Sequence, residues 1–361
     1  MKTRLDGIRA RLEQAGVDAL LVSSADNRRY LSGFTGSAGS LIITLKDAVL
    51  ATDFRYVEQA SQQAPDFRVL RTRGGLDWLS NLLKELNVQC LGFEDQHMTV
   101  AIHGGIHKVL EDGDGNSSTA LVATSGLVEE LRAVKDSQEM AILTRAVEIS
   151  DRAFREVSKT IQAGLKEIEV AWRLEKAMRE MGAEAVSFET IVAAGPNAAL
   201  PHHRPADVPI LEGQPLIIDM GARYQGYCSD LSRTLCLGQP DDTFRRVYDT
   251  VLGAQLTAIA TVERGMTGGD ADGLARTVID AAGYGENFGH SLGHGVGLEV
   301  HEQPGVGPNS HNVLEDGMPF TIEPGIYISG WGGVRIEDVV VLEDGRARVI
   351  SKAPKLEMMG G

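Results

Sequence analysis

The sequence predicts two domains, an α/β domain at the N-terminus and an α+β domain after it. Up to about residue 130, short apolar runs alternate with amphipathic stretches, as strands and helices do in an α/β domain. A long helical pattern with an acidic first turn then spans 136–161. Beyond it helices and strand pairs are mixed, and two of the pairs carry facing acidic residues. We therefore expect domains at 1–132 and 133–361.

Composition excludes several classes of protein. With 361 residues, 43% hydrophobic and 24% charged, the chain can bury a core in each of two domains. The formal net charge of −15 argues against nucleic acid or an anionic membrane as a partner, because both require a basic surface. No run has the length of a membrane span, and the N-terminus lacks the features of a signal peptide. The cysteines Cys90, Cys228 and Cys236 form no C-x-x-C motif, which suits a reducing cytoplasm.

The first domain should begin with a helix, because apolar residues recur at helical spacing from Thr3 to Gln14 and Gly16 follows. A second helix is expected at 52–64, capped by Thr52 or Asp53. The remaining expected elements are strands at 18–23, 39–45, 47–52, 67–71 and 90–95 and a helix at 75–86.

The second domain should contain four amphipathic helices. They are expected at 136–161, 165–182, 242–263 and 269–282. The segment 187–207 begins as a strand and ends in a loop rich in proline and histidine.

A predicted β-hairpin at 215–237 carries two aspartates. An apolar run from Pro215 to Met220 is followed by turn residues and a second strand-like run. If the two-residue loop is Tyr224-Gln225, Asp219 and Asp230 lie directly opposite each other. Carboxylates held that close repel unless a cation lies between them. The hairpin therefore indicates a cation site.

A second hairpin, in the segment 321–342, repeats this arrangement. Glu323 and Glu337 are opposite partners if its loop has three residues centred on Gly330. Between the two hairpins, the segment 289–304 places three histidines among glycines. A single aspartate after a strand is usually a turn residue, and a single histidine usually has no catalytic role. The joint occurrence of two acid pairs and a histidine cluster is what indicates a metal centre.

The motifs DMG…SDLSRT, GHGVGLEVHEQP, TIEPGIY and GVRIEDVV resemble, in this order, the ligand motifs of the pita-bread metallopeptidases. That family includes methionine aminopeptidase, Xaa-Pro aminopeptidase and prolidase, and the resemblance covers about 136–350. It implies a pita-bread catalytic domain with two divalent metal ions. Asp219 would chelate one ion, His294 and Glu323 the other, and Asp230 and Glu337 would bridge both. One imidazole and four carboxylates favour Mn²⁺, with Co²⁺ or Zn²⁺ as alternatives.

The same resemblance implies roles for the residues around the metal ions. A bridging hydroxide would attack the peptide bond, and Glu323 would transfer the proton to the leaving nitrogen. Arg335 resembles a substrate-carboxylate or structural arginine, and its position on the strand does not require it to point at the metal ions. His202 is expected on the substrate side of the metal ions. His290 and His301 are expected beside the oxyanion. The same two histidines and Tyr327 are expected to line the pocket for proline.

The segments NRRYLSGFTGSAG and TDFRYVEQA resemble the creatinase-type N-terminal domain of the Xaa-Pro branch, which methionine aminopeptidases generally lack. The resemblance therefore implies an Xaa-Pro aminopeptidase that acts on proline-containing peptides, and a homodimer. The alternative is an Xaa-Pro dipeptidase (prolidase), in which a basic residue such as Arg55 or Arg204 would cap the substrate's carboxylate. His203 and Arg204 depart from the small residues common at their positions.

Two remote alternatives belong to other functional classes. The same fold occurs as a metal-free amidinohydrolase of the creatinase type and as non-enzymatic binding modules, in which metal ligands are replaced. All five ligand positions are intact in this sequence, which argues against both.

Overall fold

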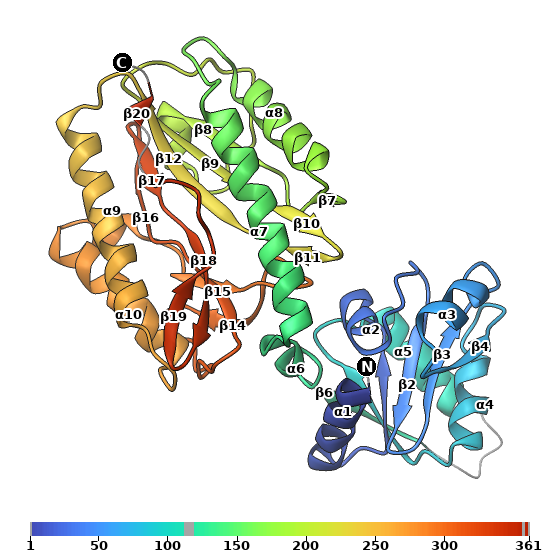
Figure 1. Ribbon diagram of the computed structural model, residues 1–361. Helices are drawn as coiled ribbons and strands as arrows, with labels where there is room; N and C mark the ends of the chain where they lie inside the picture. The colour runs from blue at the N-terminus through green and yellow to red at the C-terminus, as the bar shows by residue number, and fades with distance from the viewer. Residues whose placement is uncertain (1, 112–118, 356–357, 360–361) are drawn as a thin grey trace. The chain divides into compact units, whose positions relative to one another are not determined.

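The computed structural model describes residues 2–111, 119–355 and 358–359 (Figure 1). The chain divides into two compact units, Met1–Arg132 and Ala133–Gly361. Within the described ranges, no helix combines the length and apolar character that a membrane crossing requires.

The N-terminal unit is built on one six-stranded mixed sheet, with the strand order β4-β3-β2-β1-β5-β6. Neighbours β1 and β5, β5 and β6, and β3 and β4 are parallel, and the remaining pairs are antiparallel. Its strands are β1 (Ala19–Val22), β2 (Ser40–Thr44), β3 (Ala48–Thr52), β4 (Arg68–Arg71), β5 (Cys90–Glu94) and β6 (Ala120–Thr124). Its helices are α1 (Lys2–Ala15), α2 (Ala25–Ser32), α3 (Val57–Gln63), α4 (Asp77–Glu85), α5 (Val100–Glu111) and α6 (Glu129–Ala133). The expected α/β architecture is confirmed.

In the N-terminal unit one helix begins later than expected, and α2, α5, β6 and α6 were not predicted. The helix predicted to begin at residue 52 begins at Val57, because the side chains of Thr52 and Asp53 are engaged elsewhere. The Thr52 hydroxyl donates to the carbonyl of Ala38, and the Asp53 carboxylate binds Arg55. Helix α2 was not predicted, since it is only two turns long and its apolar periodicity is weak.

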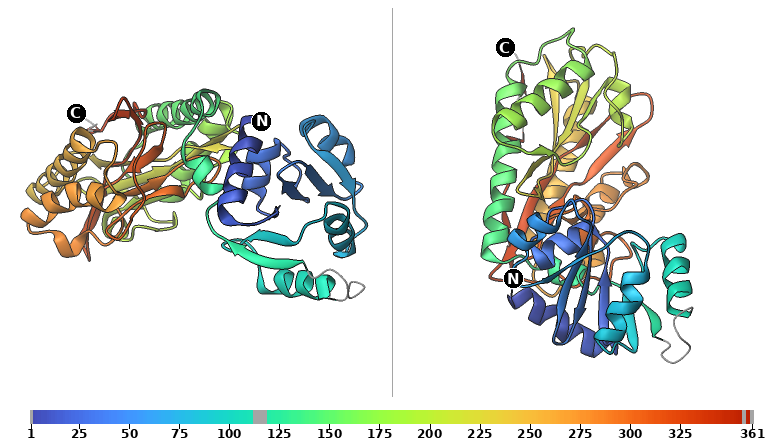
Figure 2. Two further views of the ribbon diagram at one scale, coloured as in Figure 1. Left: turned by 90° about the horizontal axis from the view of Figure 1, so that it is seen from below. Right: turned by 90° about the vertical axis from the view of Figure 1, so that its right-hand side faces the viewer.

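The C-terminal unit consists of two halves, each with two helices packed against strands. In the first half α7 (Ser137–Ser158) and α8 (Glu167–Glu180) pack on the four-stranded sheet β20-β12-β9-β8. In the second, α9 (Asp242–Thr261) and α10 (Gly268–Ala281) pack on the sheet β14-β13-β15-β18-β19. Figures 1 and 2 show α9 beside α10, on the other side of the strands from α8. All four helices were predicted, and the pita-bread fold class is confirmed.

The strands of this unit are short and often interrupted. Those of the first half are β7 (Ala185–Val186), β8 (Ile191–Ala194), β9 (Pro215–Met220), β10 (Ala222–Tyr224), β11 (Tyr227–Cys228), β12 (Leu231–Leu237) and, at the C-terminus, β20 (Met358–Met359). Those of the second half are β13 (Gly293–Gly295), β14 (Glu302–Val306), β15 (Pro319–Ile322), β16 (Gly325–Ile328), β17 (Gly332–Arg335), β18 (Asp338–Glu343) and β19 (Arg346–Val349). Two 3₁₀ turns, η1 (Gly195–Ala199) and η2 (Gly285–Asn287), complete the unit.

The predicted register of the first hairpin is wrong by two residues. Asp219 pairs with Ser232, not with Asp230, because the loop residues are Gln225 and Gly226. Both have positive φ, 46° and 83°, which the type I′ turn requires at its two central positions. Glycine at the second central position therefore decides the register.

The predicted register of the second hairpin is confirmed. Ile328 pairs with Gly332 and Gly325 with Arg335, around a three-residue loop whose centre is Gly330. Gly330 has φ of 80°, a conformation that glycine adopts without strain. The same register continues into β15 and β18, where Ile322 pairs with Asp338.

Candidate metal centre

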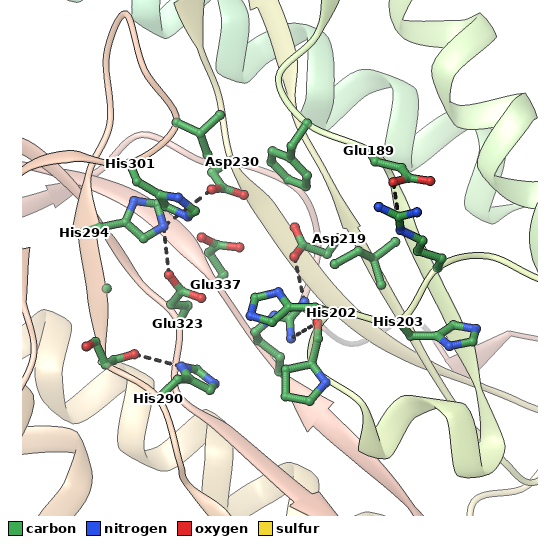
Figure 3. Close-up of a pocket in the computed structure, with 18 residues that line it drawn as sticks. Glu189, His202, His203, Asp219, Asp230, His290, His294, His301, Glu323 and Glu337 are labelled. Carbon is green, nitrogen blue, oxygen red and sulfur yellow. Dashed lines mark hydrogen bonds and ion pairs between the residues drawn. The ribbon is translucent and has the colours of Figure 1, made fainter. Parts of the chain in front are cut away.

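One cavity of about 590 Å³ lies between the two halves of the C-terminal unit (Figure 3). It brings together nine of the ten side chains singled out from the sequence. The tenth, Tyr327, forms hydrogen bonds with two of the nine, His290 and Arg335. The nine that line it are Asp219, Asp230, His294, Glu323, Glu337, His202, His290, His301 and Arg335.

Interruptions in the strands position the acidic residues. Asp230 lies between β11 and β12, Glu323 between β15 and β16, and Glu337 between β17 and β18. At these breaks the backbone leaves its own ladder: the Glu323 amide donates to Leu292, and the Glu337 amide donates to Ser232. Each break lets a carboxylate turn into the cavity without disturbing the strand on either side.

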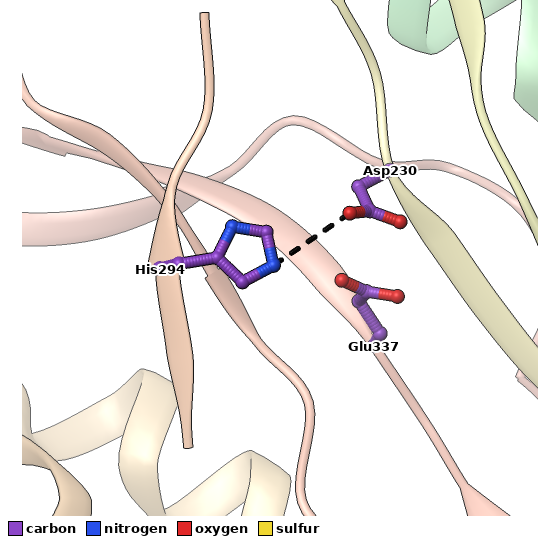
Figure 4. Close-up of side chains that lie close together, drawn as sticks. All are labelled: Asp230, His294 and Glu337. Atoms are coloured by element: carbon purple, nitrogen blue, oxygen red, sulfur yellow. Dashed lines mark ion pairs between the residues drawn. The ribbon is translucent and has the colours of Figure 1, made fainter. Parts of the chain in front are cut away.

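Asp230, His294 and Glu337 form the tightest cluster, with ligand atoms all within 4.8 Å of one another (Figure 4). The His294 Nε2 atom lies 3.7 Å from an Asp230 oxygen and 3.1 Å from a Glu323 oxygen. Its Nδ1 atom lies 3.1 Å from the carbonyl of Gly295. That contact keeps a proton on Nδ1, so Nε2 is the nitrogen that faces the carboxylates; without a metal ion it carries a proton shared with Glu323, and a bound cation would take the place of that proton.

The donor set fits divalent cations. Within the described residues, Asp219 Oδ1 and Glu337 Oε1 are buried and have no hydrogen-bond partner. A buried carboxylate oxygen without a partner is costly, and a cation removes that cost. Four carboxylates and one imidazole are ligands that Mn²⁺, Co²⁺ and Zn²⁺ accept.

The charges in the cavity also favour a cation. Burial, followed by the charge of Glu337, raises the pKa of Asp230 well above its usual value. Burial, followed by the charge of Glu323, does the same for the pKa of Glu337. Burial also acts to raise the pKa of Glu323, but the hydrogen bond and charge of His294 outweigh it and hold this pKa at about 2. Without a metal ion, two of these carboxyls would therefore retain protons that a cation would displace.

Arg335 points into the site, whereas the sequence did not require it to do so. Its Nη2 atom lies 2.6 Å from Asp219 Oδ2, its Nη1 atom 2.8 Å from the Tyr327 hydroxyl, and its Nε atom 2.8 Å from the Ser232 hydroxyl. The reason is strand alternation: Arg335 and Glu337 are two residues apart and share a face. Arg335 is thus a buried partner of one predicted metal ligand.

The contacts of His290 fix its tautomer. Arg335 can only donate, so the Tyr327 hydroxyl accepts from it and donates to His290 Nε2 at 2.9 Å. The other nitrogen, Nδ1, then donates to the carbonyl of Ser291 at 2.8 Å. Burial lowers the pKa of His290, which favours this neutral form. Both ring nitrogens are therefore occupied before any substrate binds.

His202 and His301 differ from His290 in this respect. Both line the cavity, and neither makes a hydrogen bond to another residue in the described ranges. The His301 ring packs edge-on against His294, with ring centroids 4.2 Å apart. These two rings are available to donate to a bound molecule.

One residue of this site was missed. Glu167, at the start of α8, is fully buried and accepts hydrogen bonds from the loop that carries His202. Its position beside the capping residue Lys166 gave no indication of this contact, which spans about 36 residues of chain. Arg55, left open from the sequence, belongs to the N-terminal unit and binds Asp53 there.

Comparison with known proteins agrees with this geometry. Residues 141–344 match the model of metallopeptidase family M24, and residues 4–134 match that of the creatinase/prolidase N-terminal domain. The solved structure of an Xaa-Pro dipeptidase from Bacillus anthracis is 43% identical, covers 99% of both chains and superposes with a TM-score of 0.94. An X-Pro aminopeptidase from Thermotoga maritima is 37% identical over 97% of this chain and 100% of its own, with a TM-score of 0.87. The Xaa-Pro dipeptidase of Pyrococcus furiosus is 35% identical over 98% of this chain and 99% of its own. With its five ligand side chains gathered in one cavity, the chain therefore belongs to metallopeptidase family M24 and is a metal-dependent peptidase with a creatinase/prolidase N-terminal domain.

Proposed function

We propose that the protein is an Xaa-Pro aminopeptidase, which removes the first residue from peptides that have proline in second position. The observation that supports this proposal concerns the cavity of about 590 Å³, which all five ligands line. Among the described residues that line it, no buried cationic side chain is free to bind the carboxylate of a dipeptide. Arg335 is engaged by Asp219 and Tyr327, and the exposed Arg204 lies with Glu189 beyond Asp219, on the side of the cavity opposite to Glu323 (Figure 3). The names of the relatives from Bacillus anthracis and Thermotoga maritima support the choice of the Xaa-Pro bond.

The chemistry divides between the metal ions and the chain. Divalent ions held by the five ligands would supply Lewis acidity and a nucleophilic water at neutral pH. Glu323 lies beside His294 in the cavity, and we assign to its carboxylate the acceptance of the proton of that water. The nitrogen of proline carries no hydrogen in the peptide, so the departing ring must receive a proton, and Glu323 delivers it.

The oxyanion of the tetrahedral intermediate requires hydrogen-bond donors. His202 and His301 line the cavity with uncommitted rings, so we assign this role to them in preference to His290. We assign His290 and Tyr327, which hold each other through the 2.9 Å hydrogen bond, to the wall that receives the proline ring.

Prolidase is the second candidate, because relatives from Bacillus anthracis and Pyrococcus furiosus are named Xaa-Pro dipeptidases. The two functions differ in substrate length, since a dipeptidase must bind a free carboxylate next to proline. Comparing kcat/KM for Ala-Pro with that for Ala-Pro-Ala-Ala separates them. We expect the tetrapeptide to be the better substrate. Hydrolysis of the dipeptide alone would make the protein a prolidase.

Further properties complete the proposal. Mn²⁺ is the expected ion because the ligands are mostly oxygen atoms. A homodimer is expected from the resemblance of the N-terminal unit, and a cytoplasmic location is supported by three cysteines, all free thiols. Elemental analysis of the purified protein and light scattering coupled to size exclusion test the first two.

A further inference from the structure

An ion pair lies at the end of the cavity away from the metal cluster. Arg204 Nε is 3.3 Å from Glu189 Oε2, and both residues line the cavity. Figure 3 shows Glu189 beyond Asp219, on the side opposite to His294 and Glu323. The side chains are 83% and 63% exposed, so either one can exchange its partner for a charged group on a ligand.

The backbone around Arg204 is firmly held although its side chain is exposed. The buried carboxylate of Glu167 accepts from His203 Nε2 at 2.8 Å and from the amide of Ala206 at 3.0 Å. Its other oxygen accepts from the amide of Ala194 at 2.8 Å. Arg204 is therefore presented to the cavity from between two anchored residues, on a loop that does not need to order when a ligand binds.

Apolar side chains line the cavity together with this ion pair. They are Phe188 and Ile191, which are close to Glu189 in the sequence, and Pro201. A long side chain can place its methylene groups on such a surface while its charged end reaches the mouth. The cavity thus combines an apolar lining with one exposed cationic and one exposed anionic group.

The orientation of the substrate follows from Glu323. Because Glu323 delivers a proton to the nitrogen of proline, the proline residue lies on the side of Glu323 and His290. The first residue of the peptide, Xaa, then lies on the side of Asp219, where Figure 3 places Glu189. This orientation rests on the function proposed above.

We propose that Glu189 and Arg204 select the Xaa residue by charge. An acidic Xaa side chain pairs with Arg204, and a basic Xaa side chain pairs with Glu189. Each charged substrate thereby takes the place of one member of the resting ion pair, so peptides with an acidic Xaa and peptides with a basic Xaa are both accepted. The ratio of their kcat/KM values then depends on the presence of both Arg204 and Glu189.

The test measures the ratio of kcat/KM for Glu-Pro-Ala to that for Lys-Pro-Ala. Arg204→Gln should lower this ratio about two- to five-fold, and Glu189→Gln should raise it by a similar factor, which is the range for exposed ion pairs. Matched controls come from exposed pairs outside the cavity: Arg264→Gln, from the pair with Asp316, and Glu263→Gln, from the pair with Arg346. They change the net charge equally and should leave the ratio unaltered.

The outcomes are separable from the test of the proposed function. If the unaltered protein does not cleave Ala-Pro-Ala, the proposed function fails. If it does, but neither substitution moves the ratio or both move it in the same direction, the charge selection is wrong. The substitutions could instead change the ratio of kcat/KM for Ala-Pro-Glu to that for Ala-Pro-Lys and leave the ratio for Glu-Pro-Ala to Lys-Pro-Ala unaltered. That result would put the ion pair on the proline side of the cavity and overturn the orientation.

Discussion

The two hairpins that carry the carboxylates have the same plan but were not equally predictable. Each is a pair of strands broken at an acidic residue and joined by a turn with positive φ. In the second hairpin, the three-residue loop around Gly330 gave the observed register. In the first, the sequence YQGY allows two positions for a two-residue loop, and only the pair Gln225-Gly226 places glycine where φ is 83°.

The difference shows why a wrong register still located the site. A shift of two residues moves partners along the strand but leaves every side chain on its original face, because side chains alternate with a period of two. Asp219 and Asp230 therefore still face one cavity, although Ser232 is the direct partner of Asp219. A shift of one residue would have turned one of the aspartates away.

Removal of the metal ions should have the largest effect, because it affects both hairpins at once. Prolonged chelation should abolish peptidase activity, and Mn²⁺ or Co²⁺ should restore it. Activity of the treated protein, with residual metal measured by elemental analysis, is the check. Full turnover by demonstrably metal-free protein would contradict the metal centre.

Changing one carboxylate in each hairpin should separate an effect on catalysis from an effect on stability. Glu323→Gln should lower kcat by about 10²- to 10⁴-fold with little loss of stability, because it removes the proton-accepting group. Asp219→Asn should also destabilise the fold, by about 3 kcal/mol, because it weakens the buried pair with Arg335. Thermal unfolding and kcat measured together separate the two. Equal stability losses would mean that the Arg335 contact contributes nothing.

A smaller effect concerns the pH dependence of stability without metal ions. Burial raises the pKa of Asp230 and of Glu337. For His294, burial lowers the pKa, but the hydrogen bond with Glu323 and the charge of Glu323 outweigh burial, so the pKa is raised. The folded chain then holds more protons than the unfolded chain, so stability falls as pH rises through these raised values. The lowered pKa values of His290 and His301 act oppositely only below about pH 6.5.

The measurement is therefore made above that pH. As the pH rises above 6.5, the melting temperature of the metal-free protein should fall relative to that of the metal-loaded protein. Asp230→Asn, which removes one of the raised groups, should flatten the trend in the metal-free protein. A constant difference between the two forms across this range would contradict the assigned shifts.

The turns should give the smallest effect. Gly226→Ala and Gly330→Ala each force a side chain into positive φ and should cost about 1 kcal/mol. Neither change should alter kcat, since neither residue lines the cavity. A loss of activity in Gly226→Ala alone would show that the tip of the first hairpin also controls the position of Asp219.

The sequence predicted the features that local patterns determine. The helices α7 to α10 are long and amphipathic, and α7 and α10 each begin with a capping box. Their positions were therefore clear from apolar periodicity and from the signals at their ends. Two acidic pairs on apolar strands indicated a cation site, and the resemblance of the motifs to the metallopeptidases singled out His294 among the nearby histidines as the fifth ligand. Helix α2 and the strand interruptions were not predicted, because a single short break leaves no mark on a pattern of alternating residues.

Contacts between distant segments were out of reach. Nothing near Glu167 indicates that its carboxylate holds the loop of His203, and nothing near Arg335 indicates that it binds Asp219. Both pairings exist because the halves of the unit fold against each other, and local periodicity carries no information about which distant side chain fills a buried position.

The backbone bonds at the ligand positions have a consequence for how the unit opens. The amide of Glu337 donates to Ser232, and that of Arg335 donates to the Thr234 hydroxyl, so strands of the second half are fastened to β12 of the first. Neither amide can exchange its hydrogen with solvent until the two halves separate. Separation also disperses the metal ligands, and bound metal should therefore slow exchange at these two amides far more than at amides of the outer helix α8. The catalytic centre and the seam between the halves should thus behave as a single cooperative unit of local unfolding.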